Sequence, residues 1–452
     1  MEEELTEEQL RERQERRRRR KEERLRHVRR MRILCCFFAL AICVIAGSIA
    51  AAVRSRAAKK TDAKQIELAS IEAERVKVAS EAEAEKEEAA KKRLEDLPDV
   101  GAIYGIYVKE RGWSHFFADN SYCMAPVGNS VTAIRATLHN QPEGMTGTIT
   151  YQVNLSGSGW LDWQEDGSDG GRIDQDMPLE AVRMQLTGEL GEYYDILYSV
   201  LQDEAWTDWV MNGEEAGASG VGLRMDGLRI SVVKKQEGKT SYAGGIDPAK
   251  PMIALTYDDG PSSTETPKIL EALKAAGGKA TFFMVGKQVE KNSGIVKQMA
   301  EQGCEVGNHT YDHTLMTKVE PMALAEQLAR TNQVVSDSSG ISPVLMRPCG
   351  GARCDAGMDV VGAVSMPAVM WSIDTLDWKT RDTQNTIQTV LDQVQDGDII
   401  LMHDLYEATA AASQTLIPEL VSRGYQLVTV SELASYRGGM LPGKAYSRFR
   451  PN

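Results

Sequence analysis

The sequence predicts a mixed α/β protein. A distorted (β/α)7-type barrel at its C-terminal end is preceded by an all-β pseudo-threefold repeat domain, a helical stalk and one transmembrane helix. Three observations support this fold class. Residues 250 to 435 alternate short apolar runs with helix-like stretches, as parallel sheets covered by helices do. Residues 100 to 234 carry short strand-like segments that recur at regular intervals. Residues 33 to 53 contain no charged side chain.

The N-terminal segment predicts a membrane signal-anchor. The 21 uncharged and mostly apolar residues from Ile33 to Val53 are enough to cross a bilayer as a helix. Residues 1 to 32 form an Arg-rich tail, and this excess of positive charge predicts that the N-terminus stays in the cytoplasm. The chain beyond Arg56 is then expected outside the cell. A cleaved signal peptide is the alternative, because Ala50-Ala51-Ala52 is small enough for a cleavage site.

Residues 57 to 97 are rich in Ala, Glu and Lys and predict a solvated helical stalk. Ile66, Ala69, Ala73 and Val76 form a thin apolar stripe near helical spacing. A coiled coil is the alternative, so the oligomeric state stays open.

Composition excludes two classes of protein. The net charge of −13 and the pI near 5.2 argue against a nucleic-acid partner. Seven cysteines do not form a disulfide framework in a chain of 452 residues. Cys349 and Cys354 are close enough in sequence for a local bridge, and free thiols are the alternative.

Residues 100 to 234 contain three similar units marked by Trp113, Trp160 and Trp206, which are 47 and 46 residues apart. β-like runs precede these tryptophans at residues 103–108, 149–153 and 194–200, and alternating segments follow at 131–138, 179–186 and 223–230. Three copies of one unit predict a closed pseudo-threefold β structure, such as a trefoil or a prism. The units resemble clostridial hydrophobic repeats with a characteristic tryptophan, and the third copy matches best.

The role of the tryptophans has two interpretations. Trp113, Trp160 and Trp206 are expected to be core residues, one per repeat. Trp163 and Trp209 are better candidates for ligand contact, because exposed aromatic rings often stack on sugars. The repeat domain is therefore expected to bind glycan or a wall protein, or to act as a spacer, rather than to catalyse a reaction.

Strands and helices alternate in the C-terminal part. Strand-like runs cover residues 252–256, 280–285, 305–307, 344–347, 368–373, 398–402 and 426–430, and helix-like stretches include 266–275, 321–336 and 383–395. Residues just after parallel strands point to one face of such a fold. The polar residues at or just after these strands are Asp258, Asp259, His309, Arg347, Asp374, Asp377 and His403.

Two of these segments predict a metal site. His309 and His313 are four residues apart, which would place them on one face of a helical turn. A carboxylate from the pair Asp258-Asp259 would complete three protein ligands and leave an open position for water. The other aspartate would remain free to act as a base, so the residues suit metal-assisted hydrolysis.

Five segments occur in the order of a known set of motifs: Thr256–Pro261, His309–His313, Arg347–Gly351, Asp374–Trp378 and Leu401–His403. They resemble the polysaccharide deacetylase family, also called the NodB-homology domain or carbohydrate esterase family 4. The resemblance covers roughly residues 250 to 435. Each segment alone has a plain structural explanation, such as a turn at Asp258–Pro261, but their joint order does not.

The resemblance implies a ligand set and a base. Asp259, His309 and His313 look like ligands of a divalent metal, which is zinc in most members of the family, with Co²⁺ or Mn²⁺ as alternatives. Asp258 looks like the general base, and Arg347 would orient its carboxylate.

The resemblance also implies an acid and a substrate pocket. His403 looks like the general acid, and Asp377 would raise its pKa. The amide of Gly350, where the family usually has Tyr, would help bind the oxyanion. Leu401 and Trp378 would form the walls of the acetyl pocket. Cys349 stands where the family usually has Pro, and this departure has no explanation from sequence.

These features together predict a membrane-anchored, extracytoplasmic, metal-dependent deacetylase. The expected substrate is N-acetylglucosamine in peptidoglycan, because the anchor and the stalk would place the barrel within the cell wall. N-acetylmuramic residues, chitin oligomers and O-acetylated xylan are alternative substrates. A wall-binding or adhesion protein with a catalytically idle barrel is the alternative from another class.

Overall fold

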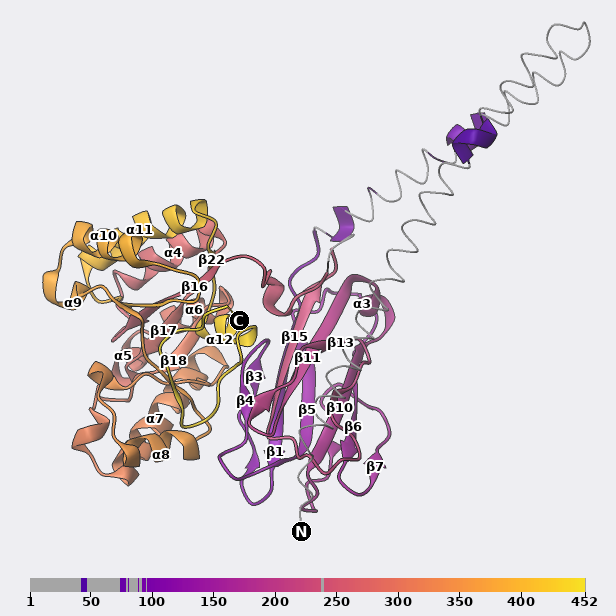
Figure 1. Cartoon of the computed structure of the whole chain (residues 1–452), viewed down its shortest axis with the longest axis horizontal. Coiled ribbons are helices and arrows are strands. Elements are labelled where there is room, and N and C mark those ends of the chain that lie inside the picture. The colour runs from indigo at the N-terminus through magenta and orange to yellow at the C-terminus, as the bar shows by residue number, and fades with distance from the viewer. Residues whose placement is uncertain are drawn as a thin grey trace, which may run out of the picture. The chain divides into compact units, whose positions relative to one another are not determined.

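The computed structural model describes residues 42–46, 74–78, 80, 88, 92–94, 96–236 and 240–451. The predicted cytoplasmic tail lies outside these residues, and so do most of the predicted transmembrane helix and stalk. Among the described residues, no helix combines the length and the apolar composition that a bilayer crossing requires. Residues 94 to 452 form one compact unit of mixed α/β structure, and the following description concerns this unit (Figure 1).

The β-rich part of this unit, residues 101–234, is built on three antiparallel strand pairs. They are β1 (Gly101–Val108) with β5 (Val131–His139), β6 (Ile149–Leu155) with β10 (Leu179–Leu186), and β11 (Tyr194–Gln202) with β15 (Gly227–Lys234). A two-residue strand carrying a tryptophan pairs with the first strand of each: β2 (Gly112–Trp113), β7 (Gly159–Trp160) and β12 (Ala205–Trp206). The predicted third alternating segment, 223–230, was misplaced, because its strand begins at Gly227 and ends at Lys234.

Each sheet also takes a short strand from another unit. β9 (Gly170–Gly171) pairs with β5, β14 (Ala216–Gly217) pairs with β10, and β4 (Cys123–Met124) pairs with β15. The remaining short elements are β3 (Phe117–Ala118), β8 (Gln164–Glu165), β13 (Val210–Met211) and helix α3 (Gly188–Tyr193). This exchange joins the three sheets around one apolar core.

Three buried tyrosines occupy equivalent places in that core. Tyr104, Tyr151 and Tyr198 lie on the first strand of each pair, and each ring is fully buried. Their hydroxyl groups donate hydrogen bonds to the backbone carbonyls of Ser121, Ser168 and Glu214, respectively. A buried hydroxyl needs such a partner, so each unit uses the same internal link between strand and loop.

The β/α part has a parallel sheet in the order β18–β17–β16–β21–β20, with β22 also paired to β16. Its strands are β16 (Met252–Asp258), β17 (Thr281–Met284), β18 (Glu305–Asn308), β19 (Ala368–Val369), β20 (Ile373–Asp374), β21 (Ile399–His403), β22 (Gln426–Leu427) and β23 (Ala445–Tyr446). Single bridges join Asn308 to Met346 and Met346 to Ala368, and β19 pairs with β23. The predicted strand 344–347 is therefore one bridge, and the predicted strand 368–373 is divided into β19 and β20.

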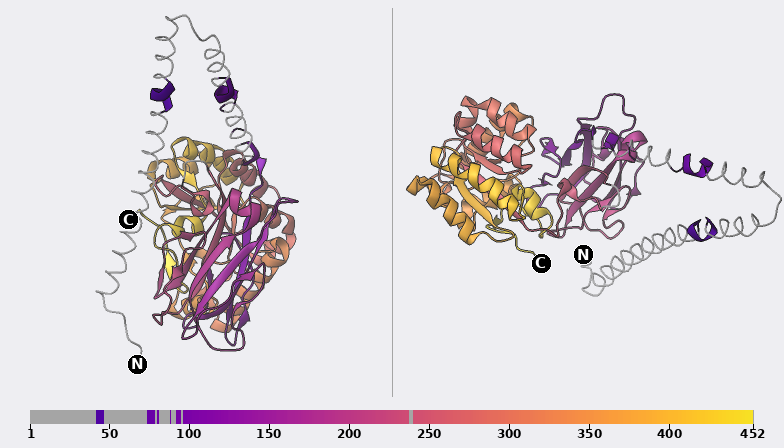
Figure 2. Two further views of the ribbon diagram at one scale, coloured as in Figure 1. Left: turned by 90° about the vertical axis from the view of Figure 1, so that its right-hand side faces the viewer. Right: turned by 90° about the horizontal axis from the view of Figure 1, so that it is seen from above.

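Helices follow most of these strands, and Figure 2 shows the orange to yellow helices lying around the strands of this part. They are α4 (Thr266–Ala276), α5 (Gly286–Lys291), α6 (Ser293–Glu301), α7 (Pro321–Ser339), α8 (Asp355–Ala363), α9 (Asp377–Thr380), α10 (Thr383–Gln393), α11 (Glu407–Ser422) and α12 (Val430–Ser435). Pro stands in the first turn of α4 and of α7, where its missing N–H costs nothing. Left-handed Gly277 and Gly340 end these two helices.

Strand register positions the candidate site. In the parallel sheet, Asp258 at the end of β16 lies beside Phe283 of β17 and His403 at the end of β21. Met284 of β17 lies beside Asn308 at the end of β18. The carboxyl ends of these strands therefore meet at one edge, which brings segments far apart in sequence together.

Candidate active site

Asp258 is held by a buried arginine. Arg347 Nη1 donates to Asp258 Oδ1 at 2.7 Å and to Thr256 Oγ1 at 2.8 Å. The carbonyls of Val369 and Met370 accept hydrogen bonds from the same guanidinium, each at 3.1 Å. Burial lowers the pKa of Arg347, while the charge of Asp258 opposes this effect. The carboxylate of Asp258 is thus fixed in one orientation by a charge-assisted contact.

Asp259, His309 and His313 converge beside this pair. Asp259 Oδ1 lies 3.4 Å from His309 Nε2 and 3.1 Å from His313 Nε2. His309 Nδ1 is 2.8 Å from the carbonyl of Arg347, so this nitrogen carries the proton and Nε2 is left free to bind a metal.

The sequence predicts that the two histidines lie on a helical turn, and this prediction is wrong. They follow β18 in a loop in which Thr310 and His313 have left-handed φ angles of 58° and 59°. Residues four apart therefore approach each other by a reversal of the backbone. Asp259 also has a positive φ, of 74°, directly after β16. Such strained conformations cluster at functional sites.

The residues present fit a divalent metal. Asp259 Oδ1 is a buried oxygen without a hydrogen-bond partner, although two imidazole nitrogens face it. Burial raises the pKa of Asp259, but the contacts with His309 and His313 outweigh burial and hold that pKa well below its ordinary value. The contact with Asp259 raises the pKa of His313. A carboxylate oxygen and two imidazole nitrogens are a common donor set for zinc.

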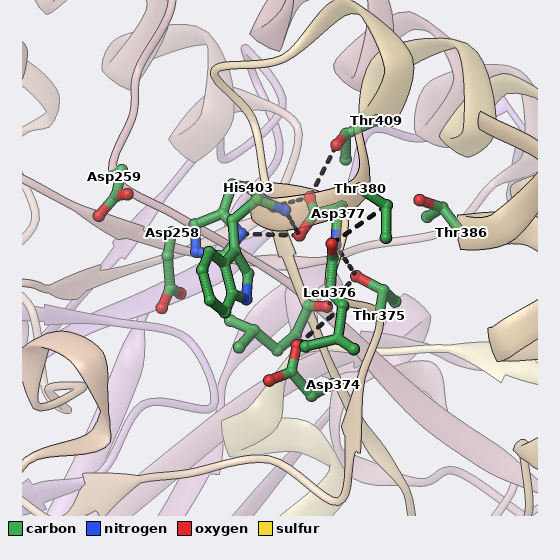
Figure 3. Close-up of polar contacts among 12 residues, drawn as sticks. Asp258, Asp259, Asp374, Thr375, Leu376, Asp377, Thr380, Thr386, His403 and Thr409 are labelled. Atoms are coloured by element: carbon green, nitrogen blue, oxygen red, sulfur yellow. Dashed lines mark hydrogen bonds and ion pairs between the residues drawn. The ribbon is translucent and has the colours of Figure 1, made fainter. Parts of the chain in front are cut away.

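A second polar pair is formed by His403 and Asp377 (Figure 3). His403 Nδ1 lies 2.9 Å from Asp377 Oδ1, and the backbone N–H of His403 donates to Asp377 Oδ2 at 2.8 Å. Thr409 Oγ1 donates to Asp377 Oδ2 at 2.7 Å, and the N–H of Trp378 donates to Oδ1 at 2.8 Å. Asp377 is therefore a fully bonded, buried carboxylate.

The pKa values of this second pair move in opposite directions. Burial lowers the pKa of His403, but the hydrogen bond and charge of Asp377 outweigh it, and the net pKa is raised. Burial raises the pKa of Asp377, and His403 and Thr409 reverse this effect, so that pKa is lowered. The arrangement favours an imidazolium next to a carboxylate, which suits a general acid.

The residues predicted to line the substrate pocket make fewer contacts with these catalytic candidates. Trp378 reaches Asp377 through its backbone, and its side chain is 46% exposed. Leu401 is buried, and its carbonyl accepts a hydrogen bond from Thr375 Oγ1. Gly350 lies in a short 3-10 turn, Cys349–Gly351, with a left-handed φ of 56°. Asp374 accepts the N–H of Leu376 and shapes a turn.

Three residues of the site had no interpretation from sequence. Cys349 donates to the carbonyl of His309 at 3.3 Å, and its sulfur lies with His309 and His313 in a group that could hold a metal. Burial raises its pKa to about 12, and both Cys349 and Cys354 are free thiols. Thr409 and Asp404 are both buried, and burial raises the pKa of Asp404 to about 7. No motif residue adjoins Thr409 in sequence, so only the fold identifies it.

Two families match this chain. The polysaccharide deacetylase family matches residues 245–369, and the clostridial hydrophobic W family matches residues 201–234. A peptidoglycan-N-acetylglucosamine deacetylase of Listeria monocytogenes is 42% identical over 194 residues, which cover 43% of this chain and 41% of that protein. A peptidoglycan-N-acetylmuramic acid deacetylase of Bacillus subtilis is 38% identical over 188 residues, 42% of this chain and 40% of that protein.

A shorter relative is matched over most of its length. It is a peptidoglycan-N-acetylglucosamine deacetylase of Bacillus cereus, 35% identical over 191 residues, which cover 41% of this chain and 89% of that protein. The chain spans about two fifths of the length of the Listeria and Bacillus subtilis relatives.

Proposed function

The chain belongs to the polysaccharide deacetylase family, and from that premise we propose that it removes N-acetyl groups from peptidoglycan N-acetylglucosamine. One observation carries the proposal. Asp258, oriented by Arg347, and His403, paired with Asp377, end the neighbouring strands β16 and β21, and Asp259 beside Asp258 forms a cluster with His309 and His313. A base and a separate acid near a metal-binding group are the equipment of a metal-dependent amide hydrolase.

The chain's own residues divide the reaction between them. A divalent metal bound by Asp259, His309 and His313 would lower the pKa of water and polarise the acyl oxygen. Asp258 accepts the proton of the attacking water, and Arg347 keeps its carboxylate turned toward that water. His403 donates a proton to the leaving amine, and Asp377 keeps the imidazole protonated until then. The amide of Gly350 is proposed as the oxyanion donor, with Leu401 and Trp378 lining the acetyl pocket.

The proposed substrate follows from the relatives. The relatives from Listeria and Bacillus cereus carry N-acetylglucosamine in their names, and the relative from Bacillus subtilis carries N-acetylmuramic acid. Muramic residues are therefore the second candidate substrate, ahead of chitin-type or O-acetylated xylan chains.

We extend the proposal to metal, architecture and location. Zinc is the proposed metal, with Co²⁺ and Mn²⁺ as alternatives, because one carboxylate and two imidazoles suit it. The β/α part is proposed to be a distorted seven-unit barrel and the β-rich part a pseudo-threefold repeat domain. The uncharged residues 33 to 53 support a single membrane anchor with the site outside the cell.

The test measures acetate released from purified peptidoglycan by the full-length chain, with and without a chelator. We expect release that stops with chelator and returns with Zn²⁺. Muropeptide mass spectrometry identifies the deacetylated sugar. Asp258→Asn should lose release while its metal content, measured by elemental mass spectrometry, stays that of the wild type.

Two outcomes contradict the proposal. Full activity of Asp258→Asn would exclude Asp258 as the base. No release from any acetylated glycan with any of the three metals, by a chain that binds metal, would favour the wall-binding protein with an idle barrel.

A further inference from the structure

Each unit of the β-rich part stacks an arginine on its tryptophan. The Arg135 guanidinium lies 4.1 Å from the ring centre of Trp113, and Arg183 lies 4.1 Å from Trp160. Arg229 lies 4.3 Å from Trp206. In all three units the tryptophan sits on the short strand that pairs with the first long strand. The three pairs are therefore the same structural device, repeated.

The tryptophan of the third pair contacts a turn of this chain that contains Gly439. Trp206 Nε1 donates to the carbonyl of Met440 at 3.0 Å. A Cβ placed on Gly439 would come within 2.3 Å of Trp206 Cδ1, so only glycine can lie against this edge of the indole. Gly439 also has a left-handed φ of 74°. Trp206 thus recognises a glycine by close contact and the next carbonyl by a hydrogen bond.

Arg229, which stacks on Trp206, is buried at this contact. Arg229 is 1% exposed and donates to Tyr122 Oη at 2.8 Å, to Ser435 Oγ at 3.2 Å and to Ser199 Oγ at 3.3 Å. Ser435 belongs to α12 of the β/α part. The third pair therefore acts as a joint between the β-rich and β/α parts of the unit.

The first pair also faces the β/α part. Trp113, Phe117 and Tyr122 line a cavity of about 190 Å³ together with Val344 and Met366. Trp113 thus borders a cavity, and among the described residues the third pair is the one that holds a turn of the chain.

The second pair neither lines this cavity nor holds a turn among the described residues. Trp160 is partly exposed, as Trp113 and Trp206 are, and the nearby Trp163 is 42% exposed. Arg183 is anchored by Glu215, with 3.2 Å between Nη2 and Oε2. Within residues 96–236 and 240–451, no hydrogen-bond acceptor is found for Trp160 Nε1. Among the described residues, the donor that Trp206 uses to hold Met440 is thus free in the second unit, as it is in the first, where Trp113 borders the cavity.

We propose that Trp160 and Arg183 form a docking site for a glycine-containing turn of another polypeptide. The glycine would lie against the indole edge, and the carbonyl of the following residue would accept a hydrogen bond from Trp160 Nε1. Asp162, Glu165 and Asp166 are exposed near the pair in sequence, so a turn with basic flanks fits best. The proposal concerns the repeat unit and does not depend on the deacetylase activity.

A polypeptide fits this site better than a sugar for two reasons. The third pair, which has the same geometry, already holds a backbone turn. The Arg183 guanidinium also covers one face of the Trp160 ring, which leaves at most one face on which a pyranose could stack.

The test uses the turn that Trp206 holds as its probe. A dye-labelled peptide with the sequence of residues 435–444, which contains Gly439 and the basic residues Arg437 and Lys444, is titrated with the full-length chain. Fluorescence anisotropy is expected to saturate near a dissociation constant of about 1 mM or below, because one glycine contact and one hydrogen bond give weak binding. Trp160→Ala should weaken binding at least about tenfold.

Matched controls separate the proposed contact from nonspecific binding. A peptide carrying Ala at the position of Gly439 should not bind, because its Cβ would clash with the indole. Trp163→Ala, which removes a neighbouring exposed ring, should retain most of the binding.

Three outcomes would overturn the proposal. One is the absence of saturable binding. Another is equal binding by the glycine and alanine peptides. The third is binding of N-acetylglucosamine oligomers, but not the peptide, in a manner that depends on Trp160; this would assign a glycan site instead.

Discussion

Replacing Asp377 by Asn tests whether this carboxylate keeps His403 protonated. The substitution preserves the size of the side chain but removes its charge. Asp377 accepts a hydrogen bond from His403 Nδ1 at 2.9 Å, and its other three bonds come from Thr409 and two backbone N–H groups. Since burial alone lowers the pKa of His403, loss of the Asp377 charge should let that pKa fall.

The size of the effect follows from this contact. A hydrogen bond to a charged group contributes about 1.5–3 kcal/mol, and about 1.4 kcal/mol corresponds to one pKa unit. The pKa of His403 is therefore expected to fall in Asp377→Asn. On the alkaline side of the pH profile, the protonated fraction, and with it the rate, should fall about 10- to 100-fold.

The assay is the pH dependence of kcat/KM for acetate release. In Asp377→Asn, the alkaline limb should move to lower pH. Thr409→Val is the matched control, because it removes one hydrogen bond from Asp377 and leaves the charge beside His403. Its alkaline limb should stay in place. An unmoved limb in Asp377→Asn, or an equal movement in Thr409→Val, would refute the assignment of His403 as an acid maintained by Asp377.

The same pair makes a stability prediction. Because the pKa of His403 is raised in the folded protein, its protonated imidazole stabilises the fold below the ordinary value of 6.5. This contribution is lost as the pH rises through the raised pKa. Because the pKa of Asp377 is lowered in the folded protein, its carboxylate stabilises the fold above the ordinary value of 3.8. This contribution is lost as the pH falls through the lowered pKa. Denaturant unfolding should therefore show the largest difference between wild type and Asp377→Asn between these two values, and a difference that does not change with pH would contradict this account.

Three further predictions concern other parts of the unit. Trp206→Ala should lower the free energy of unfolding in urea by about 3–5 kcal/mol, because it removes the side chain that packs on Gly439. Trp160→Ala should change this free energy by less than about 1 kcal/mol. Equal losses in the two variants would contradict the role of Trp206 as a joint between the two parts. His313→Ala should reduce bound zinc, measured by elemental mass spectrometry, at least about tenfold, and unchanged zinc would remove this residue from the ligand set. Cys349 should resist thiol reagents at pH 8 until the protein unfolds, since it is buried with a pKa near 12, and rapid labelling of the folded chain at this residue would refute that.

Much of the candidate site was predictable because its motifs lie at strand ends. Asp258 and His403 were expected close together from the alternation of strands and helices, and the register places them side by side. The family resemblance is confirmed by the matched residues 245–369. The role of each site residue stays a prediction, which the variants described above test.

Other features were not predictable, for physical reasons. The spacing of His309 and His313 suggested a helical turn, but two left-handed residues bring the rings together instead. Single-sequence patterns do not reveal positive φ at residues other than glycine. Thr409 contacts Asp377 across 32 positions of the chain, so no local pattern could assign it.

The sequence by itself determined the α/β class, the family and the order of the site motifs. These depend on periodicity and on residue identities, which are local properties of a chain. Only the tertiary structure decided which of three similar tryptophans is engaged. Trp206 meets Met440 across 234 positions, while Trp160 meets no acceptor among the described residues. Contacts between segments far apart in sequence depend on the whole fold, and so three similar repeats have different surroundings.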